Sequence, residues 1–143
     1  MTRIAQCCCG SLRAEASGEP VLVHVCHCIE CQRRTGSVFS VGSFFPKSQV
    51  HIQGPSKVSV RDGQEGRKVR MRFCPDCGTT VYGEADARPG LSAIFVGAFG
   101  DPNFPAPTRS IWEQSRHSWA GFNQEVGQEV GHFAQAASTV ASS

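Results

Sequence analysis

The eight cysteines are the feature that most restricts how this chain can fold, because they fall into three short clusters. The clusters read QCCCG, CHCIEC and FCPDCGT, at residues 6–10, 26–31 and 73–79. The N-terminus MTRIAQCCCG lacks the apolar core of a secretion signal. We therefore expect a reducing, cytoplasmic setting, in which cysteines bind metal or do chemistry rather than form disulfides.

The third cluster is the most specific local pattern, because Cys-x-x-Cys-Gly is typical of a zinc knuckle. Its two thiolates lie one short turn apart, and Gly78 permits the positive φ that turns backbone N–H groups toward sulfur. Cys7 and Cys9 end in the same Cys-Gly pair and offer the other two ligands. Cys8 is expected to point away, either as a small buried hydrophobe or as a bystander thiol. We predict a structural zinc site with four thiolate ligands: Cys7, Cys9, Cys74 and Cys77.

The second cluster leaves three thiols, Cys26, Cys28 and Cys31, without a fourth cysteine. His27 lies between two of them, and adjacent residues point in different directions, so it is a poor fourth ligand if both neighbours bind. The other histidines show no ligand spacing. A zinc ion held by three protein ligands with a vacant corner is typical of catalytic sites. We therefore predict a catalytic zinc on these three cysteines, and the spacing disfavours an iron–sulfur cluster.

Short segments of alternating or β-branched residues, separated by glycine and proline turns, predict an all-β fold. The length suits one domain, and we expect this domain at residues 1–122 and a flexible tail at residues 123–143. Within the tail, a brief helix near Phe133 to Ala137 is the only regular structure expected. The expected strands lie at residues 11–17, 21–25, 37–45, 49–52, 57–62, 67–73, 79–84 and 91–99.

The charge pattern argues against two classes of partner. The formal net charge is +2 and the isoelectric point about 8.2, without a long basic run. A nucleic-acid-binding surface is usually more basic than this. Because there is no run of ~18 apolar residues, a membrane span is also not expected. The oligomeric state is left open.

The order of these motifs resembles a known family. Cys-x-Cys-Gly comes first, then His-x-Cys-His-Cys-x-x-Cys followed by QRRTGS, then RFCPDCGT. This order resembles the glutathione-dependent formaldehyde-activating enzymes and the related centromere protein V domains, from about Ile4 to Phe122. The resemblance implies an Mss4-like fold of short antiparallel strands with two zinc ions, one structural and one catalytic, on the cysteines predicted above. It also implies a carbon–sulfur lyase reaction that joins formaldehyde to the glutathione thiol and gives S-hydroxymethylglutathione.

The chemistry of three thiolates agrees with that activity. Anionic sulfurs weaken the acidity of the metal, so the site suits a soft thiolate guest better than a strong hydroxide nucleophile. We therefore expect two small-molecule partners, a thiol such as glutathione and a small aldehyde. The alternative is a non-enzymatic zinc module that binds a protein or chromatin, which would usually carry a basic tail.

Other residues are weaker candidates, and each has a plainer interpretation. His27 could orient a ligand or shuttle a proton, or lie on the surface. Arg33 and Arg34 could bind substrate carboxylates or form a solvated face, and Glu30 is expected to face solvent. A tight turn at residues 35–37 could present backbone donors near the metal. Three residues of a late segment could wall the pocket or simply close the core: Trp112, Arg116 and Trp119.

Overall fold

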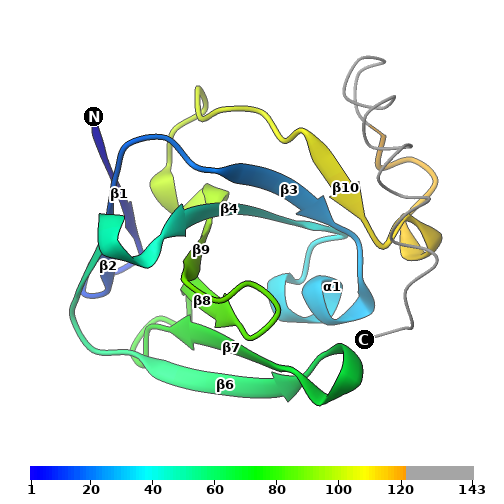
Figure 1. The fold of residues 1–143 in the computed structure, drawn as a ribbon, viewed down its shortest axis with the longest axis horizontal. Coiled ribbons are helices and arrows are strands. Elements are labelled where there is room, and N and C mark those ends of the chain that lie inside the picture. Colours follow the sequence, from blue (N-terminus) through cyan, green and yellow to red (C-terminus); the bar gives the residue numbers. More distant parts are fainter. Residues whose placement is uncertain (122–143) are drawn as a thin grey trace. The chain divides into compact units, whose positions relative to one another are not determined.

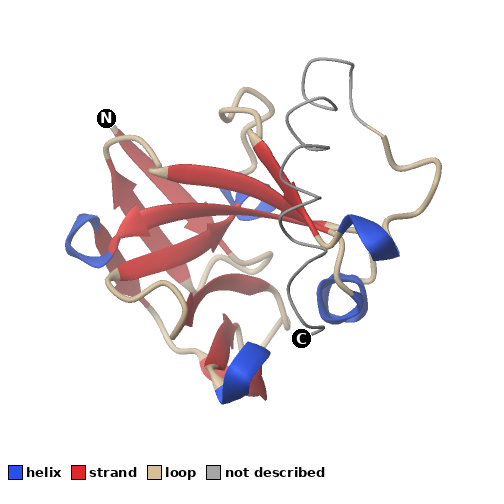
Figure 2. Cartoon of the chain, turned by 45° about the vertical axis from the view of Figure 1, so that its right-hand side comes forward, coloured by secondary structure: helices blue, strands red, loops and turns tan. Residues whose placement is uncertain are grey.

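The computed structural model describes residues 1–121, and the predicted tail at residues 123–143, with its brief helix, lies outside the described residues. The all-β prediction is confirmed, because strands dominate this part of the chain and one short α-helix interrupts them (Figures 1 and 2). The elements are β1 (Thr2–Gln6), β2 (Arg13–Ser17), β3 (Leu22–Cys26), α1 (Ile29–Thr35), β4 (Ser40–Pro46), η1 (Lys47–Gln49), β5 (Val50–Gln53), β6 (Lys57–Asp62), η2 (Gln64–Gly66), β7 (Lys68–Phe73), β8 (Thr80–Ala85), β9 (Leu91–Phe95), η3 (Val96–Phe99), β10 (Arg109–Ile111) and η4 (Glu113–Ser115).

The chain divides into two compact units. The first contains residues 1–21 and 43–104, and the second contains residues 22–42 and the chain from residue 105 onward. Each of the two cysteine groups belongs to one unit, so each can be described within its own unit. No helix in the described part of the chain is long and apolar enough to cross a membrane.

The first unit contains an antiparallel sheet in the order β1-β2-β5. Small apolar side chains face its interior, and Ala14 of β2 lies opposite both Ala5 and Ile52. The loop before β2 passes very close to the turn after β5. A Cβ atom on Gly54, whose φ is +94°, would lie 1.8 Å from the carbonyl oxygen of Ser11. Only glycine fits this approach, which fixes the position of the loop that carries Ser11.

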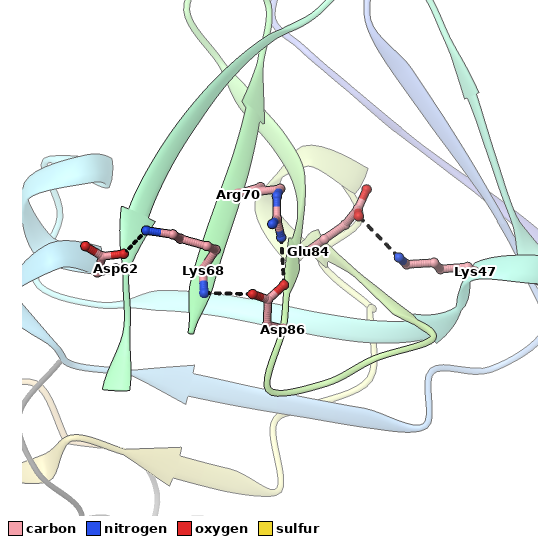
Figure 3. A network of polar contacts seen from close by, with 6 residues as sticks. All are labelled: Lys47, Asp62, Lys68, Arg70, Glu84 and Asp86. Atoms are coloured by element: carbon pink, nitrogen blue, oxygen red, sulfur yellow. Dashed lines mark hydrogen bonds and ion pairs between the residues drawn. The ribbon is translucent and has the colours of Figure 1, made fainter. Parts of the chain in front are cut away.

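Strands β6, β7, β8 and β9 of the same unit form an antiparallel meander. Its charged side chains join in a network that includes a residue of η1 (Figure 3). Asp86 accepts hydrogen bonds from the Arg70 guanidinium at 2.8 Å and from the backbone N–H of Lys68 at 2.9 Å. These ion pairs are exposed, so solvent and salt screen them and each contributes little to the stability of the fold. The network comprises Lys47, Asp62, Lys68, Arg70, Glu84 and Asp86.

The second unit pairs β3 with β10 in parallel, with Ile111 opposite Cys26. This pairing departs from the expected arrangement of antiparallel strands alone. The chain leaves β3, turns through the cysteine cluster and enters α1. The helix ends at Gly36, whose φ is +72° and whose N–H bonds to the carbonyl of Gln32 at 2.8 Å. Strands β1 and β10 and helix α1 were not predicted from the sequence.

Candidate metal centres

The first unit brings together four cysteine sulfurs that are far apart in the sequence. The Sγ atoms of Cys7, Cys9, Cys74 and Cys77 all lie within 4.8 Å of one another. Two of the spacings, Cys7 to Cys9 and Cys9 to Cys74, are 3.6 Å. With Zn–S bonds of 2.3 Å, the edge of a tetrahedron of sulfurs is about 3.8 Å, whereas a disulfide needs about 2.05 Å. The four free thiols therefore fit the ligand set of a tetrahedral metal ion.

Two similar turns build this group. Each ends in a glycine of positive φ, +81° at Gly10 and +78° at Gly78. The N–H of each glycine closes its turn onto the carbonyl of the first cysteine, at 3.0 and 2.9 Å. The backbone N–H of Leu12 then donates to the Cys7 sulfur at 3.3 Å, and a hydrogen bond of this kind favours the thiolate. In the second turn, Gly78 has the predicted positive φ, and the backbone N–H of Asp76 points at the Cys74 sulfur at 3.4 Å.

Two hydroxyl groups that sequence reasoning missed also contact the sulfurs. The Thr79 Oγ1 lies 3.3 Å from Cys77 Sγ and accepts the backbone N–H of Cys8 at 3.1 Å, so it links the two turns. Hydrogen bonding from Thr79 lowers the pKa of the Cys77 thiol to about 5. The Ser11 hydroxyl lies 3.2 Å from the Cys9 sulfur. The sequence carried a signal for both, because each hydroxyl residue directly follows a Cys-Gly pair.

Cys8 stands apart from this group. It is exposed and is not one of the four grouped sulfurs. It is therefore a bystander thiol, and the alternative of a small buried hydrophobe is wrong. Its backbone, however, helps to hold the site, because its N–H bonds to Thr79.

The second unit gathers the sulfurs of Cys26, Cys28 and Cys31 within 4.8 Å of one another. All three residues are buried, with 7%, 4% and 7% of their surfaces exposed. Contact with Cys28, then with Cys31, and finally burial raise the pKa of the Cys26 thiol far above its usual value. Three crowded, buried sulfurs cannot all ionise unless a cation balances their charge. This soft donor set fits a thiophilic metal ion.

Helix α1 explains how one short segment supplies all three sulfurs. Cys26 ends β3, and Cys28 caps the helix, its sulfur accepting the backbone N–H of Cys31 at 3.3 Å. This is the position at which serine, threonine or aspartate usually caps a helix. The first turn of the helix therefore returns Cys31 to the side of Cys28.

His27 is fully buried, so its interpretation as a surface residue is wrong. Burial lowers the pKa of its imidazole, which favours the neutral ring. Its ring lies edge-on to Phe39, with centroids 5.9 Å apart. The group of ligand atoms within 4.8 Å of one another contains three sulfurs and does not include this ring.

A hydrogen-bonded clasp joins the cysteine turn to the late segment of the second unit. The His27 carbonyl accepts hydrogen bonds from Gln32 Nε2 at 3.0 Å and from Ser115 Oγ at 2.9 Å. Gln32 Nε2 also reaches the Ser115 carbonyl at 3.0 Å, and Gln32 Oε1 lies 3.0 Å from the His117 ring. The His27 N–H bonds to the carbonyl of Ile111 at 3.1 Å. The clasp holds residues 111–117 against the turn that carries the sulfurs.

Trp112 has an unusual backbone. Its φ of 58° and ψ of 44° are left-handed, a conformation that costs about 1–3 kcal/mol for a residue other than glycine. Its partly buried side chain packs with Ile111 against the three cysteines. This position agrees with the interpretation of Trp112 as a wall of the site. Trp119 is 73% exposed, so the prediction that it might close the core is wrong. Arg116 pairs with Glu113.

The polar residues after Cys31 mainly make hydrogen bonds to α1 and to the start of β4. Arg33 is exposed, and the half-buried Arg34 donates to the Ser40 hydroxyl at 2.7 Å. The Thr35 hydroxyl donates to the Cys31 carbonyl at 2.8 Å and accepts a hydrogen bond from the backbone N–H of Ser37. Of the residues expected to form a turn at 35–37, Thr35 is the last residue of α1, and the chain turns at Gly36, whose left-handed backbone ends the helix.

The chain matches a known protein family over most of its described length. The sequence profile of the family described as glutathione-dependent formaldehyde-activating enzyme matches residues 2–115. The chain belongs to this family.

Two fungal proteins are among the curated relatives of this chain. A protein of Fusarium vanettenii, provisionally named a glutathione-dependent formaldehyde-activating enzyme, is 29% identical over 123 residues, covering 73% of this chain and 65% of that protein. A protein of Talaromyces marneffei with the same provisional name is 30% identical over 135 residues, covering 87% of this chain and 68% of that protein. The chain thus spans about two thirds of the length of these relatives.

A crystal structure of a Rhodobacter sphaeroides protein resembles this one with a TM-score of 0.50 and 18% sequence identity. The match covers 66% of this chain and 85% of that protein. At this identity the likeness supports the fold alone.

Proposed function

We propose that this protein is a zinc-dependent enzyme of the carbon–sulfur lyase class, which adds a small thiol such as glutathione to a small aldehyde such as formaldehyde. The observation that carries the proposal is the group of three buried sulfurs, which offers a metal ion one ligand fewer than the group of four. Membership of the family agrees with it. The eight cysteines, all free thiols in the structure, suit a reducing compartment, and we place the protein in the cytoplasm.

The two groups have different proposed roles. Cys7, Cys9, Cys74 and Cys77 would hold a structural zinc ion, because four thiolates complete its tetrahedron. The three-thiol group would hold a catalytic zinc ion, whose open position is its useful feature: Cys26, Cys28 and Cys31. When bound there, zinc lowers the pKa of a thiol or of water and polarises a carbonyl group.

The proposed reaction balances without an oxidant or reductant. The thiol sulfur forms a bond to the aldehyde carbon, the π bond of the carbonyl opens, and the thiol proton ends on the new hydroxyl group. The burial of the three cysteines limits competition from water. Gln32 and Ser115 hold the His27 carbonyl and thereby fix the turn that carries the sulfurs.

The activity can be tested by NMR exchange between formaldehyde and glutathione. Because the adduct also forms slowly without a catalyst, the quantity to measure is the acceleration over buffer. A thiol of pKa about 8.5 is only a few per cent ionised at neutral pH, so activation should accelerate exchange roughly 10- to 100-fold over buffer. Cys28→Ser should abolish the acceleration, and Cys8→Ser, which changes the exposed bystander thiol, should preserve it. If the protein holds its metal but accelerates no thiol, the proposal fails and the interaction module is favoured.

The metal assignment needs its own test. Elemental analysis of the purified protein should find two zinc ions, one of which leaves on mild chelation. Cys28→Ser should remove the exchangeable ion and retain the other. A single ion that resists chelation and survives this substitution would contradict the division into four and three ligands.

A further inference from the structure

We propose that Trp112 determines the substrate size that the three-thiol site accepts: its indole forms a fixed apolar wall over the sulfurs and excludes bulky aldehydes. The choice of substrate rests on the proposed function. The wall itself can be tested without turnover.

Trp112 packs against the three cysteines and is itself only partly buried. Within the second unit, the three cysteines are almost completely buried, and the partly buried hydrophobic residues packed against them are Ile111 and Trp112. The indole is the larger and flatter of the two side chains. A molecule that approaches the sulfurs on this side therefore meets the indole first.

The backbone indicates that the indole is placed there at a conformational cost. A bulky aromatic residue with φ of 58° is a genuine outlier. Glycine would adopt the same conformation without strain. The left-handed turn therefore does not need tryptophan, and what tryptophan adds at this position is its side chain against the sulfurs.

The wall is anchored to the turn that carries the sulfurs. The Trp112 carbonyl accepts hydrogen bonds from the N–H and the Oγ of Ser115, both at 3.2 Å. The same Ser115 Oγ lies 2.9 Å from the His27 carbonyl, between Cys26 and Cys28. One hydroxyl group thus ties the backbone of the wall to the backbone of the site. A wall fixed in this way can discriminate by size, because it cannot move aside at low cost.

Access to the sulfurs provides the first test, on the full-length protein with its metal. N-Ethylmaleimide alkylation is followed by mass spectrometry at the three cysteines of the site and at exposed Cys8. Trp112→Gly should raise the rate at the three cysteines about tenfold and leave Cys8 unchanged. Trp112→Phe should give a smaller increase, as should Ser115→Ala, which frees the wall but keeps the indole. The matched control, Trp119→Gly, removes an exposed indole of the same unit and should change neither rate.

Substrate size provides the second test. With glutathione as the thiol, kcat/KM is compared for formaldehyde and benzaldehyde. Trp112→Gly should shift the ratio toward benzaldehyde by about 10-fold or more, the range in which an apolar pocket discriminates by size. Trp119→Gly should leave the ratio at the wild-type value.

Three results would overturn the proposal that the Trp112 indole forms a wall over the sulfurs. One is unchanged alkylation of the three cysteines in a Trp112→Gly protein that remains folded by circular dichroism. Another is an equal increase at Cys8, which would indicate general loosening. The third is an active Trp112→Gly protein with an unchanged substrate ratio. If even the wild-type protein is inactive, the proposed function fails, but alkylation still decides whether the indole guards the sulfurs.

Discussion

The two cysteine groups use the same ligand atom in opposite settings. The four-sulfur group joins two turns from distant parts of the sequence, and two of its cysteines, Cys9 and Cys77, are exposed. The three-sulfur group comes from one short segment, is wholly buried, and is covered by Ile111 and Trp112. If the four sulfurs complete the coordination of a metal ion, that site has no open position to protect and can lie at the surface. The incomplete set is the one that the fold encloses, which is the expected arrangement if its open position is to admit a substrate selectively.

The largest expected effect is on folding. Cys74→Ser removes a buried ligand of the four-sulfur group, and a metal ion that joins two distant turns contributes directly to the free energy of unfolding. We expect a loss of about 4 kcal/mol or more, or no folded protein at all. Chemical denaturation with parallel zinc analysis measures it. A variant of wild-type stability that retains two zinc ions would end the distinction between the groups.

The corresponding change in the three-sulfur group should separate activity from stability. Cys28→Ser should lower the catalysed exchange rate by roughly 10- to 100-fold, to the rate in buffer. It should alter the free energy of unfolding far less than Cys74→Ser, because its ligands come from one local segment and close no long loop. NMR exchange and urea denaturation on the same sample decide this. Equal destabilisation by the two serine variants would show that both groups are structural.

The hydroxyl groups around the four-sulfur group should have an intermediate effect. Ser11→Ala removes a contact to the Cys9 sulfur and Thr79→Val removes one to the Cys77 sulfur. Residues that orient metal ligands typically change metal affinity by 10–100-fold, and we expect about tenfold faster zinc loss to a coloured chelator. Thr79→Ser retains the hydroxyl and serves as the control. If these variants instead lose zinc faster from the three-sulfur group, Ser11 and Thr79 do not support the four-sulfur site.

The smallest effect should come from the charged network, which lies outside both groups. Arg70 and the Lys68 N–H lower the pKa of the Asp86 carboxyl below its usual 3.8. Its contribution to stability is therefore fully present above about pH 4 and is lost as the pH falls through the lowered pKa. Asp86→Asn should slightly lower the melting temperature at pH 7, and the difference from wild type should close below about pH 4.

The zinc content of Asp86→Asn should stay at the wild-type value, since neither cysteine group contacts this carboxylate. A melting difference that persists unchanged at pH 3 would show that the carboxylate does not act through its charge. Loss of metal at neutral pH would show that the network supports one of the sites.

Most strands could be predicted from the sequence, because alternation and turn residues are local signals. Residues 57–62 form β6 as expected, and the strand expected at residues 91–99 ends at Phe95, where the chain enters η3. Strand β1 has only five residues, and its buried residue, Ala5, has little preference for strands. Strand β10 has three residues after a proline-rich stretch, and its pairing with β3 depends on contacts distant in sequence. Helix α1 has only seven residues, too few for a periodic pattern to appear.

The grouping of cysteines was predictable from spacing, whereas the surroundings of the sulfurs were not. Gln32 and Ser115 are 83 residues apart, and nothing local in either segment indicates their hydrogen bond. The left-handed backbone of Trp112 contradicts the preference of its own side chain, so a sequence pattern would not suggest it. Ser11 and Thr79 differ from these, because the repeated Cys-Gly-hydroxyl order was legible in the sequence.

Because of the close approach at Gly54, zinc binding should be sensitive to a residue that lies outside both cysteine groups. The nearest cysteine in the sequence, Cys74, is 20 residues from it. Even so, any larger side chain at position 54 must displace the backbone of Ser11, whose hydroxyl contacts the sulfurs of Cys9 and Cys74. In a library of random substitutions selected for retained zinc, position 54 should therefore tolerate as little variation as the ligands themselves. A change in metal binding would then trace to a residue that carries no metal-binding atom.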